Sequence, residues 1–130
     1  MVRVLANVLS DRLEASRDFF TELLGFEVVF ESDWYVQVAP QGEPDKIVGI
    51  WRRDHELIPA SYRDAPRGVV LTVVVEDVDA RHETAQRLGV EIVEPPTDRF
   101  YGQRSMLVTD PNGWLVDVST PIAAPGEPGK

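Results

Sequence analysis

The segment LGFEVV at residues 24–29 is the strongest indication of the fold, because it recurs as LGVEIV at residues 88–93. Each copy joins the end of an amphipathic helix to the start of a β-strand through a glycine, the residue best suited to a left-handed helix end. Arg17 and Arg81 keep the same spacing from the two copies. The repeat therefore predicts a duplicated domain, although a helix–glycine–strand junction alone is common in α+β proteins.

The pattern of apolar residues extends this repeat to the order of whole elements. In the first half, strands are expected at 2–9, 26–31, 34–39 and 47–52, with one helix at 12–24 that begins at an Asp11 N-cap and ends at Gly25. In the second half, strands are expected at 69–75, 90–93, 103–109 and 115–119, with a helix between an Asp77 cap and Gly89 and a strand end at Pro95-Pro96. Each half therefore reads βαβββ.

We predict one α+β domain over residues 1–130, built from two βαβββ modules. Module one covers about 2–52, a polar connector covers 53–67, module two covers about 68–121, and a frayed Pro/Gly-rich tail covers 122–130. A chain of 130 residues suits one domain with a core of its own.

The composition excludes several classes of function. The net charge is −9, from 22 acidic and 13 basic residues, which disfavours nucleic acid as a partner. The acidity can steer cationic ligands, or serve solubility alone. The chain has no cysteine, so disulfides and thiolate nucleophiles are excluded. No signal segment or membrane span is recognised, so the expected location is the cytoplasm, without membrane partners.

Two regions resemble a known superfamily. Residues 11–26 are similar to its first helix and helix exit, and Gly102-Gln103-Arg104, Asp110–Gly113 and Val116-Asp117 are similar to its last hairpin. This is the vicinal-oxygen-chelate superfamily of glyoxalases, bleomycin-resistance proteins and extradiol dioxygenases, and the resemblance covers about residues 3–121. It implies a cup of two curved four-stranded sheets with helices outside, frequent homodimers, and ligand sites where two modules meet.

The resemblance also implies where a metal would be held. Metal-using members carry His or Glu in the first, fourth, fifth and last strands. By alignment these positions fall at Leu5, at Ile50 (counted back from Asp117 by the spacing of the two turn motifs), near Val70 and at Asp117, and one carboxylate does not hold a divalent ion tightly. His55 in the connector and His82 on the second helix are expected to be solvated or partly buried. We therefore expect no metal and no cofactor, which disfavours the metal-dependent enzymes of the superfamily.

What remains resembles the metal-free branch, similar to the bleomycin-resistance proteins, which hold planar drugs between aromatic side chains. Tyr101, with Phe100 beside it, precedes the Gly-x-Arg run, and Trp34 begins the third strand. Polar anchors and lining are expected from Asn7, Gln37, Ile50, Arg52, Arg104 and Asp117. Packing is the alternative for each aromatic residue, and an ion pair with Arg52 or Arg104 is the alternative for Asp117. Trp51, next to Ile50, is interpreted as core, and Trp114 as a cover for the sheet end.

Three functions stay open at this point. The first is a dimeric protein that binds an aromatic or cationic drug-like compound and confers antibiotic resistance. The second is an enzyme of the same fold, a lyase, isomerase or dioxygenase, either metal-free or with an atypical metal site; a metal-free form would use Asp117 as base. The third is an interaction module whose cup is filled by its own side chains.

Overall fold

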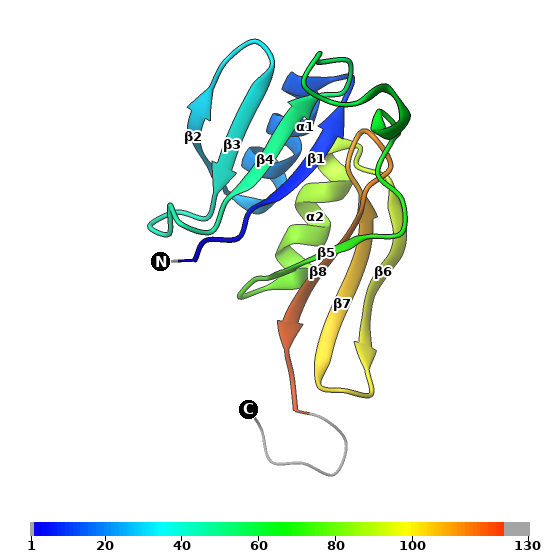
Figure 1. Ribbon diagram of the computed structural model, residues 1–130. Helices are drawn as coiled ribbons and strands as arrows, with labels where there is room; N and C mark the ends of the chain where they lie inside the picture. Colours follow the sequence, from blue (N-terminus) through cyan, green and yellow to red (C-terminus); the bar gives the residue numbers. More distant parts are fainter. Residues whose placement is uncertain (1, 124–130) are drawn as a thin grey trace. The chain divides into compact units, whose positions relative to one another are not determined.

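The computed structural model describes residues 2–123 and divides them into two compact units (Figure 1). The first unit covers the described residues up to Arg67 together with Pro111–Gly113. The second covers Gly68–Asp110 and the described residues from Trp114 onward. Most of the predicted frayed tail, residues 124–130, lies outside the described part of the chain. That the chain is a single domain with the module limits given above stays a prediction.

The first unit contains one four-stranded sheet, one longer helical segment and one short 3₁₀ helix. Its elements in chain order are β1 (Ala6–Ser10), α1 (Leu13–Asp18), the π-helical turn η1 (Phe19–Leu23), β2 (Glu27–Glu31), β3 (Tyr35–Ala39), β4 (Val48–Arg52) and the short 3₁₀ helix η2 (Ala60–Tyr62). The strand order is β1-β4-β3-β2. β1 runs parallel to β4, while the other pairs are antiparallel.

The second unit repeats this plan. Its elements are β5 (Val70–Val74), α2 (Val78–Leu88), β6 (Ile92–Arg99), β7 (Gln103–Thr109) and β8 (Leu115–Pro121). The strand order is β5-β8-β7-β6, with β5 parallel to β8 and the other pairs antiparallel. Each unit is therefore strand, helix and three strands, which confirms the predicted α+β class of two βαβββ modules.

One face of the first sheet packs against its helix and forms the core. Val8, Ile50 and Val36 lie side by side on β1, β4 and β3, and all three are buried. Ser10, on the same face of β1 as Val8, bonds to Ser16 of α1 across 2.9 Å, so this face is the one toward the helix. The prediction that Ile50 lines a ligand cup is therefore wrong.

The helix of the first unit begins differently from the prediction. Arg12, not Asp11, is the N-cap, and no side chain caps the helix. The Asp11 carboxylate instead bonds to Arg53 at 3.2 Å. Ser10 Oγ accepts from the Arg12 backbone N–H at 2.9 Å, and Asn112 donates its amide to both Ser10 and Ser16. These bonds satisfy hydroxyls that are fully buried, which is what a buried polar group requires.

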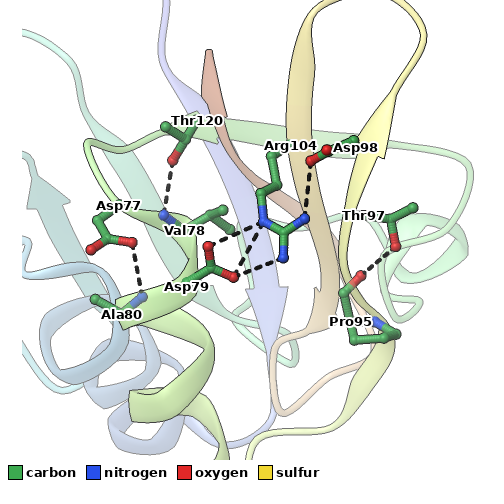
Figure 2. Close-up of polar contacts among 9 residues, drawn as sticks. All are labelled: Asp77, Val78, Asp79, Ala80, Pro95, Thr97, Asp98, Arg104 and Thr120. Atoms are coloured by element: carbon green, nitrogen blue, oxygen red, sulfur yellow. Dashed lines mark hydrogen bonds and ion pairs between the residues drawn. The ribbon is translucent and has the colours of Figure 1, made fainter. Parts of the chain in front are cut away.

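In the second unit the core is again the helix side of the sheet. Met106 pairs with Val118 and Val108 pairs with Val116, and all four are buried. The Asp77 cap is confirmed, because its carboxylate accepts from the Ala80 N–H at 3.2 Å (Figure 2).

The strand end expected at Pro95-Pro96 is wrong. β6 continues through both prolines to Arg99. They fit because β6 is an edge strand and its register is irregular between Glu94 and Thr97, so no ladder bond is lost there.

Replacement of Ile50 by alanine should lower the free energy of unfolding by about 3 kcal/mol, because it empties a fully buried site beneath the helix. Chemical denaturation monitored by circular dichroism measures this change. Val4→Ala is the matched control, since Val4 is 83% exposed, and its effect should stay below about 0.5 kcal/mol. A small effect at Ile50 would contradict its place in the core.

Candidate functional site

The face of the first sheet that points away from the helix carries a row of polar groups. Asn7 of β1 pairs with Gly49 of β4, and Gly49 pairs in turn with Gln37 of β3. These three neighbours form one rung across the sheet, which we call the Asn7–Gly49–Gln37 rung. Asn7 is exposed and Gln37 is half-buried. The expectation that Asn7 and Gln37 share one side of the sheet agrees with this register.

Gly49 allows side chains to gather over the middle of the rung. A Cβ atom at Gly49 would lie 2.0 Å from Asn7 Oδ1 and 2.8 Å from the Tyr35 hydroxyl oxygen, closer than real Cβ contacts. The Tyr35 hydroxyl also accepts a hydrogen bond from Gln37 Nε2 at 2.9 Å. A glycine inside a strand commonly marks such a close approach.

Aromatic rings continue the same face beyond this rung. Tyr35 of β3 pairs with Trp51 of β4, and their rings meet edge to face with centroids 5.3 Å apart. Trp34 lies 5.1 Å from Trp51 and stacks on the imidazole of His55 at 4.3 Å. Phe30 of β2, which pairs with Gln37, lies 6.1 Å from Tyr35. We call Trp34, Tyr35, Trp51 and His55 the aromatic cluster.

Two expectations about this face are corrected. Trp51 was interpreted as core behind Ile50, whereas the register places Ile50 on the helix side and Trp51 among the aromatic cluster. A shift of one residue in an alignment exchanges the two faces of a strand, and that is the error here. Arg52 has the same parity as Ile50, pairs with Ser10, and forms an ion pair with Asp54 at 2.8 Å. It is therefore no anchor on the open face.

In the second unit, Thr72, Asp117 and Leu107 form one rung of the face that points away from the helix. Asp117 accepts hydrogen bonds from Ser105 at 2.7 Å and from Thr72 at 3.2 Å. Asp117 lies on the open face of β8, as Gly49 and Trp51 do on β4, whereas the Ile50 that the alignment gave lies on the helix side. The open face of the second unit therefore carries a carboxylate on this strand, where the first unit has a glycine and an indole.

Arg104 does not lie on that open face. Its guanidinium bonds both carboxylate oxygens of Asp79 in the first turn of α2 and also bonds Asp98 of β6 at 3.0 Å (Figure 2). These bonds, first to Asp79 and then to Asp98, raise the pKa of Arg104 above its ordinary value. Arg104, which was expected as a polar anchor or as an ion-pair partner of Asp117, therefore bonds to neither role's partner on the open face but ties the helix to the sheet.

The predicted aromatic pair of the second unit stands at the turn between β6 and β7. Phe100 is 86% exposed and Tyr101 is 56% exposed, and their rings meet edge to face at 5.3 Å. Neither ring is packed into the core of its unit. Their role as ligand contacts stays a prediction. Trp114, by contrast, is buried.

The donor atoms do not assemble into a metal site. Within residues 2–123, no group of three or more His, Asp or Glu side chains is close enough to hold an ion. Of the four aligned positions, Leu5, Ile50 and Val70 carry no donor, and Asp117 is held by two hydroxyls. The residues present therefore do not fit the metal that the resemblance implies for its enzymes.

Four residues of this face were missed from the sequence: Tyr35, Gly49, Trp51 and His55. The signal for the first three was present, because taking Val36 and Ile50 as core residues of their strands places Tyr35, Gly49 and Trp51 on the opposite face. For His55 no local signal exists. It reaches Trp34 because the turn after β4 folds back, with the His55 N–H bonded to the Arg52 carbonyl at 3.0 Å.

The fold is that of a known superfamily. Residues 4–118 match the model of the Glyoxalase/Bleomycin resistance protein/Dioxygenase superfamily, and the chain belongs to it. A search of curated protein sequences finds no match. No helix among the described residues is long and apolar enough to cross a membrane.

Solved structures agree with this family. A superfamily member from Sphaerobacter thermophilus DSM 20745 is 24% identical, with a TM-score of 0.74, covering 92% of this chain and 97% of its own. TnmS3, described as an antibiotic binding protein from Streptomyces sp. CB03234, is 26% identical, with a TM-score of 0.71 and coverage of 93% and 96%. TioX from Micromonospora sp. ML1 is 19% identical, with a TM-score of 0.71 and coverage of 95% and 98%.

Replacement of Arg104 by glutamine should lower the melting temperature, because Asp79 and Asp98 lose their shared counter-ion and repel each other. The loss should shrink in about 1 M NaCl, which screens surface charges. Arg104→Lys should recover only part of the stability, since lysine keeps the charge but not the two-pronged geometry. Differential scanning calorimetry at two salt concentrations measures both variants, and a loss independent of salt would contradict this account.

Proposed function

We propose that this protein binds a planar aromatic small molecule, neutral or cationic, and releases it chemically unchanged. The observation that supports this most is the aromatic cluster beside the Asn7–Gly49–Gln37 rung on one sheet face. Flat apolar rings next to a few polar groups are the composition of sites for drug-sized aromatic ligands. The biological setting that we infer is sequestration of an antibiotic-like compound.

The stacking of His55 on Trp34 supports the ligand class. The two rings are inclined by only 27° with centroids 4.3 Å apart, so the indole already accommodates a planar nitrogen heterocycle. Aromatic stacking contributes about 0.5–1.5 kcal/mol beyond the area that it buries. Several rings on one face therefore supply affinity without any covalent chemistry.

The structural relatives support the same hypothesis of small-molecule binding. TnmS3 carries the description of an antibiotic binding protein and shares this fold over nearly the full length of both chains. The missing metal donors point the same way, because the enzymes of the superfamily that the sequence resembles rely on a bound ion. We therefore favour a binding function over a catalytic one.

The test of this proposal is binding of a panel of planar two- to four-ring compounds, neutral and cationic, measured by isothermal titration calorimetry. Replacement of Trp51 by leucine should weaken binding of any compound that binds by roughly tenfold, because it removes a ring but keeps apolar bulk. Tyr62→Leu is the matched control, since Tyr62 is an exposed aromatic residue in the connector, and it should leave affinity unchanged.

Two outcomes would contradict the proposal. One is the absence of binding across the whole panel. The other is recovery of a modified compound after incubation with catalytic amounts of protein, as judged by mass spectrometry. That result would favour the enzymatic reading in its place.

We further infer that the protein is a homodimer, as the family resemblance implies, and that it is located in the cytoplasm. Light scattering coupled to size exclusion should give twice the chain mass of 14.6 kDa at micromolar concentration. A mass equal to one chain over a range of concentrations would exclude a stable dimer. The ligand site would then have to be complete within a single chain.

A further inference from the structure

We propose that the ligand's polar edge is neutral, with a carbonyl and an N–H side by side as in a lactam or imide, and that it docks on the Asn7–Gly49–Gln37 rung. Gly49 then determines specificity, because without a Cβ it lets the Asn7 amide and the Tyr35 ring lie over the middle of the rung. This inference rests on the proposed function and names the ligand class for the same face.

The hydrogen-bonding groups of the rung match the edge of a neutral lactam or imide. Gln37 Nε2 donates to the Tyr35 oxygen at 2.9 Å, so the phenol proton stays available to donate to a ligand. In the described part of the chain, the side-chain amide of Asn7 makes no hydrogen bond, and its oxygen lies over Gly49. An amide offers one acceptor and a pair of donor hydrogens, which a lactam edge can match with two bonds. The rung therefore presents donors and acceptors of neutral character.

The conformation of Gly49 does not explain why a glycine stands at this position. All other glycines among the described residues have positive φ, which explains them as turn or helix-end residues. Gly49 has no such need, because it lies within β4 with ordinary strand pairing on both sides. The position requires a residue without a side chain, since a Cβ there would collide with Asn7 and Tyr35.

The three residues of the rung are all uncharged, which favours a neutral ligand edge. The arginine that ends β4, Arg52, is paired with Asp54 and has the parity of the helix side. The register also places the carboxylate of Glu27 on the open face. Glu27 pairs with Ala39, which lies two residues after Gln37 on β3 and therefore outside the rung. A charged ligand edge at the rung would lose water without gaining an opposite charge, which is unfavourable.

The experiment uses three compounds of one shape and the full chain. They are phenanthridin-6(5H)-one, its N-methyl derivative, and the N-methylphenanthridinium cation, each titrated by calorimetry. The neutral lactam should bind roughly tenfold more tightly than either control, as expected for paired hydrogen bonds that only it can make. In Gly49→Ala, the Asn7 amide and the Tyr35 ring must move, so the preference should fall below about threefold while stacking keeps some affinity.

A second variant keeps the test decisive if Gly49→Ala does not fold. Asn7→Leu has nearly the same shape, lies at an exposed position, and removes both the donor and the acceptor, so it should abolish the preference equally. Glu27→Gln is the matched control and should leave the affinity for the lactam within about twofold.

The outcomes separate the two proposals. Equal binding of all three compounds, or tighter binding of the cation, would overturn the neutral-edge inference and leave aromatic binding intact. A lactam preference that survives both Gly49→Ala and Asn7→Leu would place the polar edge elsewhere. Failure of all three compounds, together with failure of the wider panel, would overturn the proposed function itself.

Discussion

Each sheet buries one face against its own helix, and the strict alternation of side chains along a strand then assigns every residue of the other face. In the first unit the buried set is anchored by Val8, Val36 and Ile50, which share one row across three strands. A shift of one residue would exchange that row with Asn7, Gly49 and Gln37 and place polar groups in the core. Burial of the apolar face therefore fixes the position of the polar rung.

The open faces of the two units carry different groups, although the units share the βαβββ plan. In the second unit one rung of this face is Thr72, Asp117 and Leu107, and its carboxylate is held by hydroxyls of its own unit. In the first unit the Asn7 amide lies over Gly49 and makes no hydrogen bond to the other described residues. The two scaffolds are therefore similar, and they differ in a few side chains on their open faces.

The sequence predicted the fold well and the site only in part. The repeat at 24–29 and 88–93 predicted the order of elements, because helix period, glycine exit and strand period are local signals. Face assignment failed at Ile50, since the loops of the two halves differ in length and the spacing carried across them was one residue off. Arg104 was misplaced for another reason: its partners Asp79 and Asp98 come from other elements, so no local pattern indicates them.

His55 illustrates what a connector contributes to such a site. Aromatic rings in contact with water are unfavourable, and the imidazole covers one ring face of the half-buried Trp34. The turn that carries it is held by bonds from the His55 and Leu57 backbone N–H groups. The covering group is small, polar and borne on an irregular segment. If a ligand binds here as proposed, a larger planar molecule would offer this cluster more contact area than the imidazole does.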